Sequence, residues 1–289
     1  MIALGHLFAG QETDRGNPAP RHQPASRRRG ARRLRPMPVG IIGLGRLGGA
    51  LARGLGRVGG QEVYAYSRTA ATAAQVVADA PGVRLLATAA EVFERCDVVF
   101  VWMYASDARR VLAANAELLA RRQPFLVSST PDAGFGEFSP RWAEALPNVS
   151  LSTGLGVTLL TWGAQPAEAD RAAVLAPLLA CGEVYEGTAA EVEAWRALTS
   201  NGPALYARAL ECWADTVARR HGIDRELCRD MVRRTVAGTI ALQDEDGIDA
   251  AEVIRRVAHP GGSTERGLRV LDGSIEELSD GVVRALTGS

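Results

Sequence analysis

The sequence contains no lysine; all 33 of its basic residues are arginine. The absence of lysine excludes Schiff-base chemistry through a lysine amine, a phosphate-binding P-loop lysine and a lysine general base. The arginines are balanced by 33 acidic residues, so the formal net charge at pH 7 is zero. A chain without excess charge is not strongly attracted to nucleic acid or to anionic membranes, and we expect neither as a partner.

Cysteines and long apolar runs are also scarce. The four cysteines, Cys96, Cys181, Cys212 and Cys228, include no CxxC pair, so we expect reduced thiols rather than a disulfide framework or a metal site. No apolar run reaches the roughly 18 residues that suggest a transmembrane helix. The opening MIALGHLFAG lacks the basic flank and the uninterrupted apolar centre of a secretory signal. We therefore expect a cytoplasmic protein.

The first 36 residues differ in composition from the rest. Residues 11–36 are rich in Pro, Arg and Gly and have almost no large apolar side chains. Such a segment buries too little surface to offset the entropy lost on ordering, so we expect residues 1–36 to be a disordered leader. A solvated tail and an upstream start that precedes a true start at Met37 both explain it. Contact of its arginines with nucleic acid is a less favoured alternative.

From residue 38, short apolar runs alternate with stretches of helical spacing. Buried strands are predicted over 39–44, 62–67, 83–87, 97–103, 124–129, 149–154, 156–163 and 182–187. Helices are predicted over 46–58, 70–79, 107–121, 139–146 and 168–180. Strict alternation of strand and helix is typical of βαβ units. We therefore expect an α/β domain over residues 37–187, with a Rossmann-like, doubly wound sheet.

The remainder of the chain has no strand signals. Helical patterns cover 189–221, 224–242, 249–257 and 264–287, with turn sequences between them. We expect a second, all-helical domain over residues 188–289 that packs on another surface. The cleft between two such domains is the default place for a binding site.

A glycine-rich stretch follows the first predicted strand. Gly43, Gly45 and Gly48 have GxGxxG spacing between a strand and a helix. In dinucleotide-binding sheets the first glycine permits a tight turn, the second lets a pyrophosphate approach the backbone, and the third lets the helix pack closely. The strand–turn–helix context makes the match specific. The residues that we expect to bind the dinucleotide here are Gly43, Leu44, Gly45, Arg46, Leu47 and Gly48.

The end of the second predicted strand favours NADPH over NADH. An NAD site normally has an acidic residue there, whereas this chain has Ser67, Arg68 and Thr69. The two hydroxyls can donate to phosphate oxygens, and the guanidinium can pair with a 2′-phosphate. Stacking of Arg68 on an adenine ring is the alternative.

The stretch HPGGST, residues 259–264, places a tight turn before a helical segment. Several backbone N–H groups gather in such a turn without a large side chain in front of them, and this arrangement can bind an anion. A helix that is merely capped by Ser263 or Thr264 is the simpler interpretation.

Four features together resemble the pyrroline-5-carboxylate reductase family: the strand–GxGxxG–helix start, the Ser-Arg-Thr loop, the SNGPALYARALECW helix start, and the Pro-Gly-Gly-Ser-Thr turn. The resemblance covers residues 39 to about 287. It implies NADPH-dependent reduction of the C=N bond of a cyclic imino acid to proline or a proline-like cyclic amino acid. It also implies a homodimer through the helical domain, with a higher oligomer left open, and an active site to which both chains contribute.

The same resemblance implies roles for single residues. The backbone of residues 261–264 would hold the substrate carboxylate, and Thr264, the catalytic residue, would contact the imine nitrogen. The substrate-binding residues would be Asn201, His259, Pro260, Gly261, Gly262, Ser263 and Thr264. Met103 and Tyr104 would lie beside the cofactor.

The chain departs from the family at four places. Met103-Tyr104-Ala105, preceded by Trp102, replaces the usual Val-Lys-Pro, so we expect a bulkier pocket that has lost a cation. The Met-Pro-Asn-Thr-Pro segment is expected to be missing and its loop shortened. Asn201 replaces a serine, and His259 replaces the serine before Pro260. These changes leave a substituted or larger-ring imine of a specialised pathway open beside pyrroline-5-carboxylate.

Two of the replaced positions carry groups that can move protons. His259 and Tyr104 are candidate proton donors. A turn histidine without a role, and an aromatic ring that caps the sheet, are the alternatives. Two other functions also stay open. A dehydrogenase of the β-hydroxyacid type usually relies on a lysine that this chain lacks, and a non-catalytic NADP-binding dimeric scaffold would keep the fold without turnover.

Overall fold

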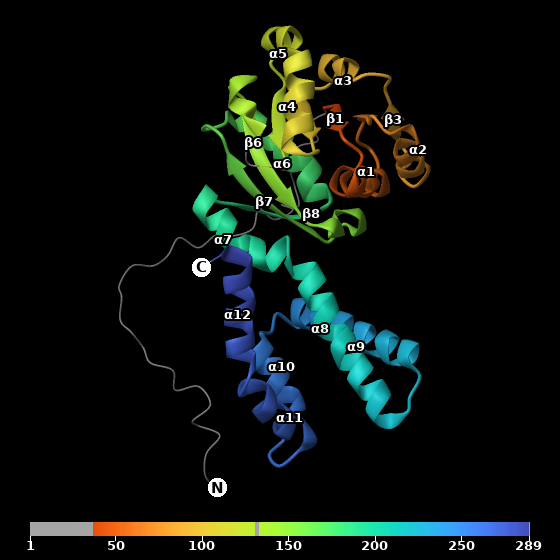
Figure 1. The fold of residues 1–289 in the computed structure, drawn as a ribbon, viewed down its shortest axis with the longest axis vertical. Helices are drawn as coiled ribbons and strands as arrows, with labels where there is room; N and C mark the ends of the chain where they lie inside the picture. Colours follow the sequence, from red (N-terminus) through yellow and green to blue (C-terminus); the bar gives the residue numbers. More distant parts are fainter. Residues whose placement is uncertain (1–36, 131–132, 289) are drawn as a thin grey trace, which may run out of the picture.

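The computed structural model describes residues 37–130 and 133–288 (Figure 1). The leader predicted over residues 1–36 lies outside the described residues. One part of the described chain is a sheet covered by helices, and the other part consists of helices alone. This arrangement confirms the predicted α/β class with a Rossmann-like sheet followed by a helical region.

The sheet has eight strands in the order β3-β2-β1-β4-β5-β6-β7-β8. The pairs from β3 to β6 are parallel, β6 and β7 are antiparallel, and β7 and β8 are parallel. The carboxyl ends of β1 to β6 therefore lie at one edge. The bounds are β1 Val39–Ile42, β2 Val63–Tyr66, β3 Val83–Leu85, β4 Val98–Val101, β5 Phe125–Ser128, β6 Trp142–Pro147, β7 Gly156–Trp162 and β8 Gly182–Glu186.

Helices cover both faces of this sheet. Side chains alternate along β4: Val98 and Phe100 belong to the core cluster that contains residues of α1, α2 and α6, whereas Val99 and Val101 belong to the cluster that contains residues of α3, α4 and α5. Both faces of a parallel sheet are buried in this way, which explains the continuous apolar strands. The helices are α1 Arg46–Val58, α2 Ala70–Ala78, α3 Ala89–Arg95, α4 Ala105–Ala114, α5 Ala116–Arg122 and α6 Glu168–Ala180.

Two predicted elements are wrong. Residues 139–146 were predicted as a helix from their spacing, but residues 142–146 belong to strand β6, in which inward and outward side chains alternate. Pairing with β5 and β7 outweighs the weak helix propensity of these residues. Residues 149–154, predicted as a strand, contain the 3₁₀ helix η3 (Val149–Thr153), which Asn148 caps by accepting from Ser150 N. The short helix α3 was not predicted.

Six helices follow among the described residues, and they share little apolar core of their own. Away from the sheet, the buried apolar cluster consists of Ala214, Ala218 and Cys228, with Val217 and Val232 packed against it. Figure 1 shows α8 to α12 standing away from the sheet, to which α7 is adjacent. The bounds are α7 Ala189–Thr199, α8 Gly202–His221, α9 Arg225–Asp246, α10 Ala250–Val257, α11 Ser263–Asp272 and α12 Ile275–Thr287.

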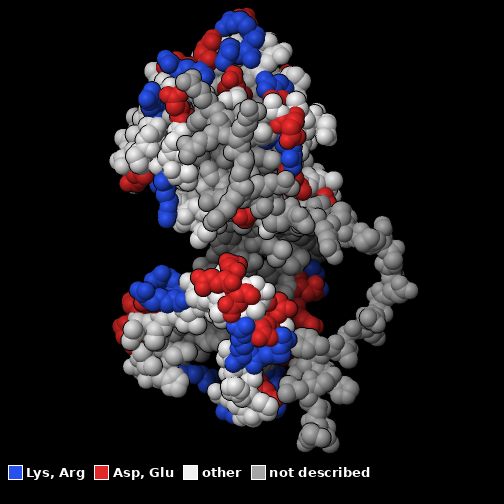
Figure 2. Space-filling model, turned by 180° about the vertical axis from the view of Figure 1, so that it is seen from behind, with Lys and Arg blue, Asp and Glu red and all other residues white. Residues whose placement is uncertain are grey.

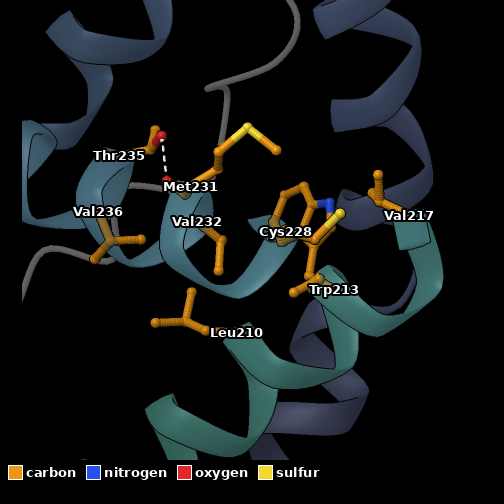
Figure 3. Close-up of a pocket in the computed structure, with 9 residues that line it drawn as sticks. Leu210, Trp213, Val217, Cys228, Met231, Val232, Thr235 and Val236 are labelled. Carbon is orange, nitrogen blue, oxygen red and sulfur yellow. Dashed lines mark hydrogen bonds between the residues drawn. The ribbon is translucent and has the colours of Figure 1, made fainter. Parts of the chain in front are cut away.

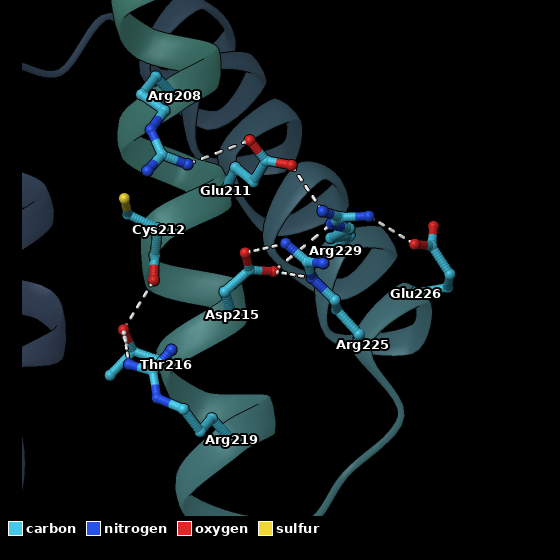
Figure 4. A network of polar contacts seen from close by, with 9 residues as sticks. All are labelled: Arg208, Glu211, Cys212, Asp215, Thr216, Arg219, Arg225, Glu226 and Arg229. Atoms are coloured by element: carbon cyan, nitrogen blue, oxygen red, sulfur yellow. Dashed lines mark hydrogen bonds and ion pairs between the residues drawn. The ribbon is translucent and has the colours of Figure 1, made fainter.

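Arginine–carboxylate pairs hold α8 against α9 (Figure 4). Arg225 donates through two nitrogens to the carboxylate of Asp215, whose side chain is 18 % exposed. Arg229 donates to Glu211 of α8 at 2.6 Å and, within α9, to Glu226 at 2.5 Å. The Arg225 hydrogen bonds lower the pKa of Asp215, so this carboxylate stays ionised at neutral pH. Forked contacts of this kind fix the geometry of two helices that bury few apolar side chains between them.

Large apolar side chains on the helical part remain exposed. They are Leu198, Tyr206, Trp213, Ile223, Leu227, Met231, Ile240, Leu242, Ile254, Val257, Val270, Leu271, Ile275, Leu278, Val283 and Leu286. Some of them line an apolar groove of about 390 Å³ between α8 and α9, into which Trp213 and Met231 project (Figure 3). Exposed apolar surface on this scale is typical of a protein–protein interface.

On the face shown in Figure 2, charged side chains of both signs lie side by side. Among the described residues, no helix combines the length and the hydropathy needed to cross a bilayer.

Close packing of α1 on η3 depends on Gly54. A Cβ atom at this position would lie 2.5 Å from Leu151 O and 2.6 Å from Cys181 Sγ. We expect Gly54→Ala to lower the free energy of unfolding by about 2 kcal/mol, because the backbone of η3 must shift. Urea denaturation followed by circular dichroism measures this change. Arg57→Ala, at an exposed position of the same helix, is the control and should stay within about 0.5 kcal/mol of the parent; an equally small effect at Gly54 would contradict the packing argument.

Candidate active site

The three glycines of the first turn have different geometries, and those of Gly43 and Gly48 match the predicted tight turn and close helix packing. Gly43 has φ +99°, and a Cβ there would lie 2.4 Å from Trp102 O. A Cβ on Gly48 would lie 1.9 Å from Gly43 O, so only glycine lets α1 start this close to the turn. Gly45 is exposed, with no atom within 4 Å of its Cβ position. The turn therefore leaves open space in front of Gly45.

The start of α1 presents backbone rather than side chains to that space. Gly45 is the N-cap, and it has no side chain to cap the helix. The first N–H groups of a helix have no partner within the helix and carry the positive end of its dipole. The side chain of Leu44 is fully buried in the core, whereas Arg46 is exposed. Of these residues, Leu44 can therefore meet a ligand only through its backbone.

The Ser67-Arg68-Thr69 loop lies next to the glycine turn, because Gly43 N donates to Tyr66 O at 2.9 Å. The side chain of Arg68 is 73 % exposed and donates to Asp107 Oδ1 at 3.4 Å. Asp107 also accepts from Arg110 at 3.1 Å. The sheet order β2-β1-β4 places Arg68 and Asp107 on either side of β1, so their contact bridges the carboxyl end of that strand.

The carboxyl end of β4 supplies three large side chains. Trp102 is buried and packs edge-on against Phe100 at 5.3 Å between ring centroids; its Nε1 has no hydrogen-bond partner among the described residues. Met103 is half-buried. The side chain of Tyr104, which precedes α4, is 84 % exposed. Tyr104 therefore does not cap the sheet as a buried ring, and its hydroxyl is accessible at this edge.

Polar residues at the ends of β5 and β6 were missed by sequence reasoning. Ser128 Oγ donates to Thr130 O at 2.7 Å, and the buried hydroxyl of Thr130 has no partner among the described residues. Asn148 Oδ1 accepts from Ser150 N at 3.1 Å and from Val157 N at 3.2 Å. Their position directly after parallel strands could have identified them. For Asn148 this position was not recognised, because residues 139–146, which contain most of β6, were predicted as a helix.

The loop after β6 contains a Pro-Asn pair. Pro147 is the last residue of β6 and Asn148 follows it directly. Leu146 precedes the pair and Val149-Ser150 follow it, so the complete Met-Pro-Asn-Thr-Pro sequence is absent here. The shortening of this loop relative to the family stays a prediction.

The helix α11, which follows the turn at residues 259–264, has no capping side chain at its N-cap residue. Gly261 has φ +74°, and Gly262 N donates to His259 O at 2.9 Å. Gly262 is the N-cap of α11, so Ser263 and Thr264 are the first two helical residues, and neither caps the helix by a side-chain hydrogen bond. The simpler interpretation, a helix capped by serine or threonine, is therefore wrong. His259, Pro260, Ser263 and Thr264 are exposed.

One chain does not bring the predicted site residues together. Asn201 lies at the start of α8, half-buried, and makes no side-chain cap. Figure 1 shows α11 at the far end of the helical part, remote from the glycine turn before α1. The glycine turn, the Ser-Arg-Thr loop and Tyr104 share one edge of the sheet, while the 259–264 turn lies elsewhere.

The cysteines add no reactive group near these residues. Cys96, Cys181 and Cys228 are buried and Cys212 is exposed. Burial, with a smaller contribution from Asp97, raises the pKa of Cys96 to about 12, so its thiol stays protonated.

Two family models match the chain. The model described as pyrroline-5-carboxylate reductase dimerisation matches residues 189–288, and the one described as NADP oxidoreductase, coenzyme F420-dependent, matches residues 38–130. The first match covers the six helices that follow the sheet, and the second covers β1 to β5.

Curated relatives are similar over most of their length. The pyrroline-5-carboxylate reductase of Aquifex aeolicus is 27 % identical over 248 residues, which are 82 % of this chain and 89 % of the relative. That of Mycobacterium tuberculosis is 28 % identical over 277 residues, which are 86 % of this chain and 93 % of the relative.

Solved structures share the fold. The pyrroline-5-carboxylate reductase of Coxiella burnetii has a TM-score of 0.76 at 20 % identity and covers 87 % of this chain and 96 % of its own. The Plasmodium falciparum pyrroline carboxylate reductase with NADP bound has a TM-score of 0.72 at 19 % identity, with coverages of 88 % and 97 %. The helical part thus matches the dimerisation model of pyrroline-5-carboxylate reductases, and the chain as a whole resembles these reductases in sequence and in fold.

Proposed function

We propose that the protein is an NADPH-dependent reductase of the C=N bond of a cyclic imino acid, with pyrroline-5-carboxylate as the first candidate substrate and proline as its product. The uncapped start of α11 carries the proposal. A helix start without a capping side chain is a binding place for an anion such as a carboxylate. The relatives that the chain resembles are named for this reaction.

The residues at the sheet edge fit NADPH. The open space at Gly45 and the uncapped start of α1 suit a pyrophosphate. Ser67, Arg68 and Thr69 would hold a 2′-phosphate, with Arg68 exchanging its contact with Asp107 for the phosphate. Met103 and Tyr104 would lie at the nicotinamide end. When bound, NADPH supplies the hydride.

The turn at residues 259–264 would orient the substrate. The backbone N–H groups of residues 261–264 would hold the carboxylate, and the hydroxyl of Thr264 would contact the imine nitrogen. A protonated imine already carries its proton on nitrogen, so positioning contributes more to the rate than a strong acid does. Asn201, His259, Pro260, Gly261 and Gly262 would complete the substrate site, with His259 exposed beside the turn.

A homodimer would bring the proposed cofactor site at the sheet edge of one protomer next to the 259–264 turn of the other. The apolar residues exposed along α8 to α12 need a partner surface, and the groove at Trp213 and Met231 would take part of it. Because α11 lies far from the glycine turn of its own chain, we infer that the 259–264 turn of one protomer meets the cofactor of its partner.

We propose the domain boundary at Gly187-Thr188, between β8 and α7.

The side chains at the end of β4 would affect which substrate rings the site accepts. Trp102, Met103 and Tyr104 are bulkier than the residues usual at this edge, and they include no cation. We propose that this edge admits ring-substituted or six-membered imino acids beside pyrroline-5-carboxylate. Comparing kcat/KM for pyrroline-5-carboxylate, its six-membered homologue and a ring-substituted analogue ranks these substrates.

Thr264→Ala should lower kcat for imine reduction by about tenfold to a hundredfold, because the hydroxyl at the imine nitrogen is lost. Affinity for NADPH should be unchanged, since the cofactor residues lie on the sheet. NADPH consumption at 340 nm and fluorescence titration measure the two effects. Thr264→Ser keeps the hydroxyl and should keep most of the rate. A full rate in the alanine variant would remove Thr264 from the mechanism, and no turnover by the parent with any imine would favour a non-catalytic scaffold.

Arg68→Ala should weaken NADPH binding by about tenfold or more and leave NADH binding unchanged, because a charge-assisted contact to the 2′-phosphate is lost. Titration of both cofactors by fluorescence measures the ratio. Arg84→Ala is the matched control, because Arg84 is a similarly exposed arginine on the neighbouring strand β3. Equal losses for NADPH and NADH at Arg68 would support adenine stacking instead.

Trp213→Asp should convert the dimer to a monomer at micromolar concentration, because a charge in an apolar interface costs several kcal/mol. Light scattering after size-exclusion chromatography measures the mass. Val58→Asp places the same charge at an exposed apolar residue of α1 and should leave the mass unchanged. An unaltered dimer in the Trp213 variant, with its helix content intact by circular dichroism, would move the interface away from this groove.

A further inference from the structure

The carboxylate of Glu265 occupies part of the turn at residues 259–264. Gly261 N donates to Glu265 Oε2 at 2.7 Å, and Arg269 donates to Glu265 Oε1 at 3.0 Å. The side chain of Glu265 is only 23 % exposed. Glu265 is the third residue of α11, so its side chain reaches back over the start of its own helix to the preceding glycine.

Two further contacts stabilise this arrangement. Arg266 donates to Gly261 O at 2.9 Å, and Gly262 N donates to His259 O at 2.9 Å. The positive φ of Gly261 turns its N–H toward the helix start. The hydrogen bond from Gly261, and then that from Arg269, lower the pKa of Glu265, so the carboxylate is charged at neutral pH.

The turn therefore binds a carboxylate that belongs to the protein itself. Of the four backbone N–H groups proposed to receive the substrate, that of Gly261 is held by Glu265 and that of Gly262 by His259 O. Only the N–H groups of Ser263 and Thr264 remain for an incoming ligand. A second carboxylate at this turn would also lie close to the negative charge of Glu265, which is unfavourable.

We propose that Glu265 is an internal competitor that sets the carboxylate selectivity of the substrate site. This inference rests on the proposed function. A carboxylate-bearing imine must displace Glu265 from Gly261, whereas a cyclic imine without a carboxylate binds with Glu265 in place. With Glu265 in place, the affinity of the site for rings with a carboxylate would exceed its affinity for rings without one by less than it would if Glu265 were absent.

Glu265→Ala tests the proposal by removing the competitor. The probes are L-proline, which carries the carboxylate, and pyrrolidine, which lacks it; both are titrated by calorimetry into the full-length dimer with NADP⁺ present. We expect the affinity for proline to rise about threefold to tenfold, as for release of one charge-assisted hydrogen bond, and the affinity for pyrrolidine to stay the same. The KM for pyrroline-5-carboxylate should fall in proportion.

Two variants make the test specific. Glu252→Ala removes the corresponding glutamate of α10, which pairs with Arg255 and Arg256 but holds no turn N–H, and it should leave both affinities unchanged. Glu265→Gln keeps an acceptor for Gly261 without the charge and should give an intermediate proline affinity. The thermal midpoint and the NADPH affinity of each variant report whether the fold is intact.

The outcomes separate the inference from the proposed function. Proline affinity that is unchanged or weaker in Glu265→Ala, with fold and NADPH binding intact, overturns the inference. Absence of proline binding in both the parent and the variant overturns it as well. If the parent turns over no imine but the proline affinity rises in Glu265→Ala, the inference stands while the proposed reaction fails.

Discussion

Backbone contact at the glycine turn is the constraint on which the sheet edge depends. A Cβ on Gly43 would meet Trp102 O, and a Cβ on Gly48 would meet Gly43 O. Because these positions lack side chains, β1, β4 and the start of α1 come close enough for their ends to form one surface. The Ser-Arg-Thr loop and Tyr104 lie at this same edge of the sheet. The first N–H groups of α1, which no side chain caps, face the open space at Gly45.

The helical part follows a different constraint. Its helices bury few apolar residues among themselves, and arginine–carboxylate pairs between α8 and α9 hold their geometry. The proposed homodimer would bury the apolar surface that these helices leave exposed, and assembly and stability would then be coupled. The same assembly would bring the 259–264 turn of one protomer to the glycine turn of its partner.

Because the chain has no lysine, its ion pairs between basic side chains and carboxylates are formed by arginine. The guanidinium fork pairs with two carboxylate oxygens at once, as Arg225 does with Asp215. Near the candidate ligand sites, single guanidinium nitrogens contact protein carboxylates: Arg68 contacts Asp107, and Arg269 contacts Glu265. Anionic ligands at the proposed sites would compete with these groups of the protein itself, and their binding would depend on how tightly those groups are held.

The sequence predicted the α/β class, the glycine turn and the helical second part, because strand length, glycine spacing and helical periodicity are local properties. Strand β6 was not readable, since its Ala-Glu-Ala-Leu composition favours a helix until β5 and β7 supply pairing partners. The burial of the Thr130 hydroxyl and the place of Asn148 were decided by tertiary structure, whereas the contact of Glu265 with Gly261 is local and was missed although it spans only four residues. The first two depend on where a backbone N–H or a strand end lies in space, which residue order does not encode locally.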